Sequence, residues 1–287
     1  MTRANAARQT LRHLLEGQNC IFPASVHDPI SARIADDLGF EMGMFGGSVA
    51  SLAVLGAPDL ILLTLTELVD QARRMTRASS LPIFVDADHG YGNALNVMRT
   101  VEELENAGVA GLSIEDTELP KQFARAEGKC LLSIEEGVGK IKAAVAARQD
   151  KNLVIAGRTD ATPITGIDDT IARLKAYERA GADILFAVGL KTMQQVEALA
   201  GVTNRPLFLG GLPVELMDKQ VLSEHRVRIC LQGHQPFAAA VQAVHDTLQA
   251  LREGVLPSEL DRIADRNLMQ RLTRTPEHQE NATDFLG

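Results

Sequence analysis

The sequence lacks two features that would each assign it to a common class of protein. It has no excess of positive charge: its formal net charge is −8, whereas nucleic acids and anionic membrane surfaces bind a concentrated basic face. It also has no apolar stretch close to the roughly 20 residues of a membrane span, and its polar start, with Arg3 and Arg8, is not a secretory signal. We therefore expect neither a nucleic-acid partner nor a membrane partner.

Cysteine is scarce as well. Cys20, Cys130 and Cys230 are odd in number, far apart and without the spacing of a metal site. Free thiols of this kind are typical of a reducing compartment, so we expect a cytoplasmic protein. No proline- or serine-rich linker divides the 287 residues, a length that can form one barrel-sized domain.

The sequence does contain a regular alternation of apolar runs and amphipathic segments. Three related segments, 37–47, 106–116 and 179–189, each end a predicted helix on glycine shortly before a strand. Helix starts are indicated by Thr64 with Glu67, by Ser133 with Glu136, and by Asn93. Eight runs rich in Val, Ile, Leu and Phe begin near Ile21, Met42, Pro82, Gly111, Leu153, Ala182, Pro206 and Val227. This alternation predicts an α/β fold, a (β/α)8 TIM barrel, with a doubly wound open sheet as the alternative.

A tail follows the last predicted barrel helix, near residues 237–252. An apolar stripe predicts a further helix there, and the end from Thr273 is polar; the stripe consists of Leu260, Ile263, Ala264, Leu268 and Leu272. We expect a catalytic barrel domain over residues 1–256 and a helical tail over residues 257–287. From the residues alone, the stripe packs either on its own barrel or on a neighbouring subunit.

Charged residues follow several predicted strands. Asp59 comes after the second, Asp86 and Asp88 after the third, Glu115 ends the fourth and Arg158 ends the fifth. The carboxyl ends of barrel strands meet at one mouth, where several carboxylates repel each other unless a cation lies among them. Oxygen ligands without a histidine or cysteine pattern favour Mg²⁺ or Mn²⁺ over Zn²⁺. Each residue alone could be a turn former or an ion-pair partner, but their recurrence at successive strand ends favours a site.

The neighbouring residues are given no catalytic role. His27 and His89 are expected to lie in exposed loops, and Gly90 and Gly92 to permit a tight turn. Tyr91 could line the pocket or only pack.

Six stretches of the sequence resemble motifs of the isocitrate lyase and phosphoenolpyruvate mutase superfamily. The resemblance implies a Mg²⁺-dependent barrel that acts on 2-oxo acids or their enol forms. It also implies a homo-oligomer, a dimer of dimers, in which the last helix is exchanged between subunits. The matching stretches are "GGSVAS" (46–51), "PDLILLT" (58–64), "VDADHGYGN" (85–93), "IEDTELPK" (114–121), "EEGVGKIKAA" (135–144) and "GRTDA" (157–161).

The resemblance also implies roles for individual residues. Asp86 would be the direct metal ligand, and Asp88, Glu115 and Asp59 would hold metal-bound waters. Ser48 and the amides beside it would bind the substrate carboxylate, and Arg158 would be its charged clamp.

One segment departs from the superfamily. Isocitrate and methylisocitrate lyases carry Lys-[Lys/Arg]-Cys-Gly-His after the "IED" stretch, and the mutases have asparagine followed by serine or threonine near positions 122 and 123. Here the segment reads Lys121-Gln122-Phe123-Ala124-Arg125, and Cys130, seven residues beyond Phe123, is interpreted as a packing residue. Both the tricarboxylate lyase and the mutase functions are therefore disfavoured.

The predicted eighth strand runs "VRICLQGHQPFAAAV" and ends at His234. It resembles the oxaloacetate decarboxylase branch of the superfamily, in which a histidine at this point faces the substrate; a structural histidine is the alternative. We expect a carboxy-lyase that converts oxaloacetate to pyruvate and CO₂ through a Mg²⁺-stabilised enolate, with His234 and Arg158 at the substrate. Phe123 would make solvation of the departing carboxylate poorer. The alternatives are another carbon–carbon lyase, a phosphonopyruvate hydrolase, or a barrel that binds a 2-oxo acid without turnover.

Overall fold

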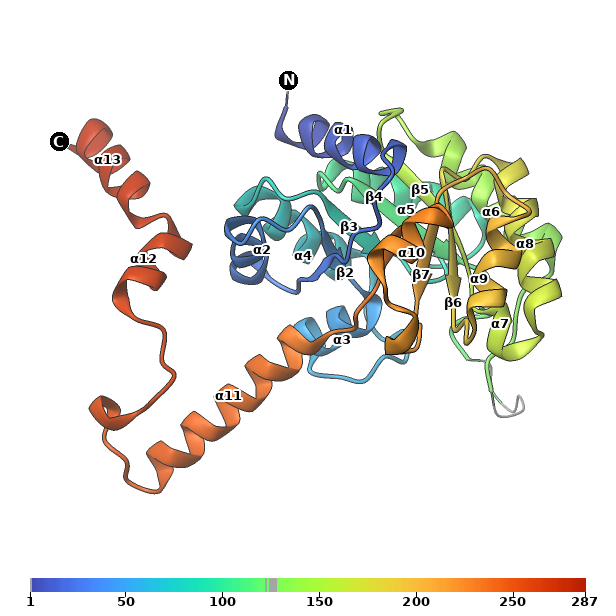
Figure 1. The fold of residues 1–287 in the computed structure, drawn as a ribbon. Coiled ribbons are helices and arrows are strands. Elements are labelled where there is room, and N and C mark those ends of the chain that lie inside the picture. The colour runs from blue at the N-terminus through green and yellow to red at the C-terminus, as the bar shows by residue number, and fades with distance from the viewer. Residues whose placement is uncertain (1, 122, 124–127) are drawn as a thin grey trace.

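The computed structural model describes residues 2–121, 123 and 128–287 (Figure 1). Its strands run parallel and in chain order through one sheet. They are β1 (Ala24–Ser25), β2 (Gly43–Phe45), β3 (Ile83–Asp86), β4 (Gly111–Glu115), β5 (Val154–Thr159), β6 (Ile184–Val188), β7 (Leu207–Gly210) and β8 (Val227–Cys230). Just before β1, the amide of Ile21 donates to Arg228 O at 2.8 Å, and the amide of Cys230 donates to Ile21 O at 3.0 Å. These bonds join the segment before β1 to β8 and close the sheet on itself, so the predicted barrel is confirmed and the open sheet is excluded.

Helices cover the outside of the sheet (Figure 1). Two of the predicted starts form full capping boxes, at Thr64 and Asn93, and Ser133 accepts a hydrogen bond from the Glu136 amide. The covering helices are α2 (Pro29–Asp37), α4 (Leu65–Ala78), α5 (Ala94–Asn106), α6 (Ile134–Ala147), α8 (Ile167–Ala180), α9 (Met193–Ala200) and α10 (Lys219–Glu224), with α3 (Gly47–Leu55) after β2, α7 (Ala161–Ile164) after β5 and the 3₁₀ turn η1 (Val214–Leu216) after β7. None of the described helices is long and apolar enough to cross a bilayer.

The barrel interior is filled by side chains and closed at the amino ends of the strands by α1 (Arg3–Glu16). Phe186 and Phe208 stack at the centre, with ring centroids 3.9 Å apart. Leu11 of α1 is buried in the same cluster, and Arg8 donates to the Val109 carbonyl at 3.0 Å. The amino end is therefore plugged, which leaves the carboxyl ends of the strands as the open mouth.

The tail differs from the expectation. Helix α11 (Gln235–Arg252) projects away from the barrel and contributes no buried residue; η2 (Pro257–Glu259), α12 (Arg266–Thr273) and α13 (Thr275–Leu286) follow (Figure 1). A single helix through residues 260–272 is wrong, because Arg262 adopts φ +54° and Asp265 starts a new helix by accepting from the Leu268 amide at 2.7 Å. Helix α12 packs on α2 of the same chain, where Arg33 donates to Leu272 O at 2.7 Å. The predicted domain boundary at residue 257 stays a prediction.

Candidate active site

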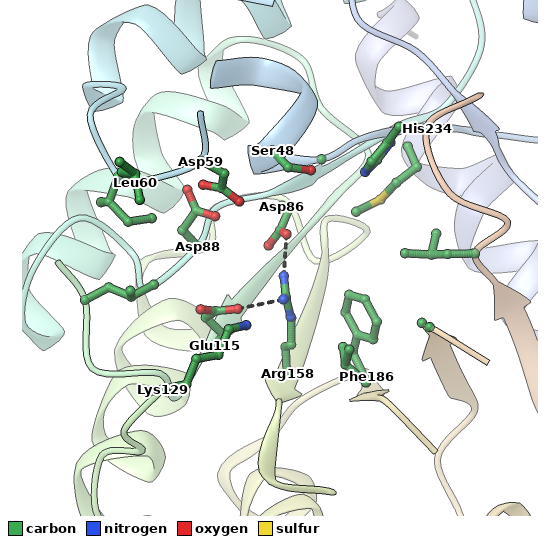
Figure 2. A pocket seen from close by; sticks show the side chains of 18 of the residues that line it. Ser48, Asp59, Leu60, Asp86, Asp88, Glu115, Lys129, Arg158, Phe186 and His234 are labelled. Carbon is green, nitrogen blue, oxygen red and sulfur yellow. Dashed lines mark hydrogen bonds and ion pairs between the residues drawn. The ribbon is translucent and has the colours of Figure 1, made fainter. Parts of the chain in front are cut away.

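The carboxyl ends of the strands surround a pocket of about 300 Å³ (Figure 2). It brings together every residue that the sequence predicts for the site: Ser48, Asp59, Asp86, Asp88, Glu115, Arg158 and His234. They come from β3, β4, β5 and the segments after β2 and β8, which the parallel barrel directs to one mouth. The chemical roles of these residues stay predictions.

Arg158 lies at the centre of the acidic groups. Its Nη1 donates to Asp86 Oδ2, and its Nη2 lies 2.9 Å from Glu115 Oε2 (Figure 2). The same Nη2 lies 3.3 Å from Asp160 Oδ1. The guanidinium carbon lies 5.3 Å from the centroid of the Phe186 ring. Burial acts to lower the pKa of Arg158, but the three carboxylates outweigh it and raise that pKa. The side chain is therefore a fixed positive charge in the pocket.

Asp86 and Asp88 are held by different means. Asp86 Oδ1 accepts from Ser113 Oγ at 2.9 Å while its other oxygen faces Arg158. Asp88 has φ +47°, which turns the chain after β3, and its carboxylate lies against the backbone of Gly47. A Cβ at Gly47 would lie 2.3 Å from Asp88 Oδ1, so this close approach requires glycine there.

Negative charge in the pocket exceeds what Arg158 neutralises. Burial, reinforced by the charges of Asp86 and Glu115, raises the pKa of Asp88 well above its usual range. Burial also raises the pKa of Glu115 to about 7, with Arg158 opposing and Asp86 adding to the shift. The pKa of Asp59 is raised by burial and by Asp86. A further cation among these acids would relieve their repulsion.

The residues present fit a hard divalent cation that keeps much of its water. Among the described residues, no three histidine, cysteine, aspartate or glutamate side chains lie close enough together to hold a metal directly. The acids that line the pocket nevertheless present only carboxylate oxygens, and Mg²⁺ commonly uses one or two carboxylates and retains several waters. One direct ligand with the other acids acting through water is compatible with this spacing.

His234 stands where β8 leads into α11, on the side of the pocket away from Glu115 (Figure 2). Its Nδ1 lies 2.7 Å from Ser25 Oγ, at the end of β1. Burial lowers the pKa of His234, although Asp86 and Asp59 act in the opposite direction. Burial therefore favours the neutral form of the imidazole.

Two charged residues of the site have only weak signals in the sequence. Lys129 lines the pocket, and its Nζ donates to Asp160 Oδ2, which in turn faces Arg158. Asp160 stands in the "GRTDA" stretch, where its position two residues after Arg158 could have indicated an ion pair. Lys129 lies in a loop without a recognisable motif. Asp116, next to Glu115, points away from the pocket and accepts from Arg173 Nη1 at 3.0 Å.

Several expectations for the loops are wrong. His89 is buried, with 4% of its surface exposed, because the left-handed turn at Asp88 and Gly90 folds the loop back and Lys140 donates to the His89 carbonyl at 2.8 Å. His27 is half-buried, with its ring in a T-shaped contact with Phe237.

The predicted turn glycines are confirmed by φ +78° at Gly90 and +146° at Gly92. The Tyr91 side chain packs against the core.

The loop after β4 also departs from the expectation. The Phe123 side chain is fully exposed and does not line the pocket, so it does not screen a substrate carboxylate in this structure. Lys121 and Gly128, on either side of it in the chain, are exposed as well. Gln122, Ala124 and Arg125 lie outside the described residues. Cys130 is half-buried, and its carbonyl accepts from the Glu118 amide at 2.8 Å at the base of the loop.

Comparison with known proteins adds independent findings. The family described as phosphoenolpyruvate phosphomutase matches residues 11–252. A protein named oxaloacetate decarboxylase from Bradyrhizobium diazoefficiens is 59% identical over 280 residues, 98% of this chain and 97% of that protein. The solved structure of oxaloacetate acetylhydrolase with the inhibitor 3,3-difluorooxalacetate has a TM-score of 0.87 at 30% identity and covers 99% and 98% of the two chains. Phosphonopyruvate hydrolase in complex with oxalate and Mg²⁺ has a TM-score of 0.86 at 27% identity over both full chains.

Proposed function

The chain belongs to the phosphoenolpyruvate phosphomutase family, and within this family we propose that it is a carboxy-lyase that converts oxaloacetate to pyruvate and CO₂. The observation that carries the proposal is the 59% identity over almost the whole chain to a protein named oxaloacetate decarboxylase. The pocket agrees in size, because about 300 Å³ suits a small dicarboxylate, and its buried guanidinium, together with a bound cation, would balance the substrate charge.

The substrate carboxylate next to the ketone would bind between Ser48 and Arg158. Ser48 lies in the first turn of α3, where free backbone amides and the helix dipole favour an anion. Arg158 would supply positive charge from the opposite side of the pocket, where its Nη1 contacts Asp86 and its Nη2 contacts Glu115 in this structure, and a substrate carboxylate would share these donors. The apolar surfaces of Phe186 and Leu231 line the same pocket and strengthen these charged contacts by excluding water.

We propose Mg²⁺ as the cofactor, with Mn²⁺ as the alternative, held directly by Asp86 and through water by Asp88, Glu115 and Asp59. When bound, the ion would supply Lewis-acid stabilisation of the negative charge that develops during decarboxylation. The proposal is supported by the raised pKa values of Asp88 and Glu115 and by the Mg²⁺ named in the phosphonopyruvate hydrolase complex.

The reaction breaks the bond between the methylene carbon and the far carboxylate. Its electron pair enters the enolate of pyruvate, CO₂ departs, and the enolate carbon takes up one proton. Arg158 keeps the retained carboxylate in place while the negative charge moves, and neutral His234 is available to donate a hydrogen bond to a substrate oxygen. Neither residue has to change its charge for the bond to break.

The missing thiol separates this reaction from tricarboxylate cleavage. Isocitrate and methylisocitrate cleavage require proton transfer at the departing carbon acid, and no cysteine is among the described residues that line the pocket. General acid–base assistance is commonly worth about 10²–10⁴-fold, so its loss should suppress this chemistry. Decarboxylation requires no such group on the enzyme, because water can protonate the enolate.

A substrate panel tests the proposal. Pyruvate formation from oxaloacetate at saturating Mg²⁺ should exceed the rate with Mg²⁺ alone, whereas isocitrate, methylisocitrate and phosphonopyruvate should yield little product. Efficient cleavage of either tricarboxylate would overturn the assignment, and rapid turnover of phosphonopyruvate would favour a hydrolase. Tight oxaloacetate binding with no turnover of any of the four would indicate a binding protein.

We also propose a homo-oligomer, a dimer of dimers. The sequence assigns the exchanged segment to the tail over residues 257–287; because α12 of that tail packs on α2 of its own chain, we propose instead that α11, which leads into the tail, is the exchanged helix. A groove of about 820 Å³ lies beside α2 and is lined by apolar residues that include Ile30, Ile34 and Phe40. Helix α11 carries an exposed apolar stripe that would fill such a groove on a second copy; it consists of Val241, Val244, Leu248 and Leu251. The free cysteines support a cytoplasmic location.

A further inference from the structure

We propose that Ser25 is a positioning residue: its hydroxyl donates to Nδ1 of His234 and holds the imidazole in the tautomer that presents an Nε2–H donor to the substrate. The inference adds a residue to the proposed decarboxylase site. Its effect on turnover rests on the proposed function, whereas its effect on the tautomer does not. Ser25 belongs to none of the motifs that indicate the site, and its side chain acts on the pocket through the histidine.

The contact between the two residues is short and sheltered. Ser25 is the last residue of β1 and is buried, with 8% of its surface exposed. Its Oγ lies 2.7 Å from His234 Nδ1, which is the usual length of a strong hydrogen bond. The two residues are far apart in the sequence and meet because the barrel closes between β8 and the segment before β1.

A second contact holds the face of the ring. A Cβ built on Gly46 would lie 2.8 Å from Cε1 and 2.9 Å from Nε2 of His234, so the imidazole rests on the bare backbone of Gly46. Gly46 also lines the pocket, next to the start of α3. The ring is thus held by a hydrogen bond at Nδ1 and by packing beside Nε2, which leaves little freedom to rotate.

The charge of the pocket selects the tautomer. If Nδ1 carried the proton, the lone pair of Nε2 would face a pocket that contains Asp59 and Asp86 and would receive an anionic substrate, and these charges would repel it. With the proton on Nε2, the ring donates toward the anion and Nδ1 accepts from the Ser25 hydroxyl. Both hydrogen bonds are then satisfied, so Ser25 and the substrate favour the same tautomer.

Nitrogen-15 NMR of histidine-labelled full-length protein tests the inference, because a ring nitrogen that carries a proton resonates apart from one that does not. The wild type should show His234 protonated at Nε2. Ser25→Ala should populate the Nδ1–H tautomer and lower kcat/KM for oxaloacetate by about 3–10-fold, as expected for one hydrogen bond. Ser25→Thr retains the hydroxyl, so it should show the wild-type tautomer and the wild-type kcat/KM. Ser79→Ala is the matched control, because it removes a buried serine that bonds to Asp36, away from the pocket.

Each outcome is decisive. An unchanged tautomer in Ser25→Ala would overturn the positioning role, and a changed tautomer with unchanged kcat/KM would overturn its importance for the reaction. If the wild type does not decarboxylate oxaloacetate, the proposed function fails, while the NMR comparison still decides whether Ser25 sets the tautomer. Circular dichroism of the variants verifies that each is folded.

Discussion

The negative charge at the mouth of the barrel is partly neutralised by basic side chains, and Arg158 makes most of these contacts. It contacts Asp86, Glu115 and Asp160, and Lys129 contacts Asp160 as well. Because one guanidinium is shared among several acids, burial and mutual repulsion keep the pKa values of Asp88 and Glu115 high. A bound cation would therefore relieve the repulsion among these acids, so we expect each acid to affect metal binding.

Asp86→Asn tests this link. The amide keeps the shape of the side chain but removes its charge, so we expect Mg²⁺-dependent kcat/KM for oxaloacetate to fall by at least about 100-fold with the fold retained. Asp70→Asn is the matched control, because Asp70 pairs with Arg73 on the surface of α4. Chelation of the wild type should cause the same loss, reversed by Mg²⁺ or Mn²⁺. Near-normal activity of Asp86→Asn at low Mg²⁺ would exclude its role as ligand.

His89 should make stability depend on pH. Burial, together with the charge of Lys140, lowers the pKa of His89 from 6.5 to about 4. Between these values the unfolded chain binds a proton that the folded chain does not, so the free energy of unfolding falls as the pH falls from 6.5 to 4. His89→Asn in chelator should remove about 1–3 kcal/mol of this fall, measured by urea unfolding across the pH range. His278→Asn, at an exposed position on α13, should leave the pH dependence unchanged.

At the scale of elements, the contact between α8 and the end of β4 depends on Tyr177. Its hydroxyl donates to Asp116 Oδ2 at 2.6 Å, and the Asp116 carbonyl accepts from the Leu132 amide at 2.8 Å where the following loop returns. Tyr177→Phe should lower the free energy of unfolding by about 1–3 kcal/mol, because it leaves a buried carboxylate with fewer donors. Tyr91→Phe is the matched control, since the Tyr91 hydroxyl is buried without a hydrogen-bond partner among the described residues. Equal losses in urea unfolding would contradict this account.

The elements also show what the sequence could predict. Strand starts from Met42 onward lie within about two residues of those expected, because apolar runs buried on both faces are a strong local signal. The four acids and Arg158 could be anticipated for a related reason, because parallel strands direct their carboxyl ends to one mouth. Ser48 and the role of His234 were indicated by the resemblance to the superfamily. Helix α1 and the contact of Ser25 with His234 could not, because both depend on barrel closure between distant segments. The burial of His89 and the break at Arg262, between η2 and α12, depend on left-handed backbone conformations at non-glycine residues, which sequence patterns indicate poorly.

On the scale of the whole molecule, α11 is unusual because it packs little against its own chain. It follows His234 directly, extends from the barrel and buries none of its own residues (Figure 1). Ser25 and Gln235 line the groove that we propose α11 of a second copy fills, while His234 lines the active-site pocket. The groove that would hold the partner helix therefore adjoins Ser25 and, through its hydrogen bond, the active-site histidine, so assembly and activity should be lost together.

Two substitutions on α11 test this dependence. Val244→Asp with Leu248→Asp places charges on the apolar stripe, and each change removes about 1.5–3 kcal/mol of apolar burial in the assembled state. We expect sedimentation to show dissociation and the oxaloacetate assay to show a parallel fall in kcat/KM. Removing the tail from Pro257 onward should also weaken assembly and reduce solubility. Leu95→Asp changes a leucine on α5 that is more exposed than either residue; it is the control and should retain the oligomer. If the α11 variant sediments like the wild type, helix exchange through this stripe is wrong.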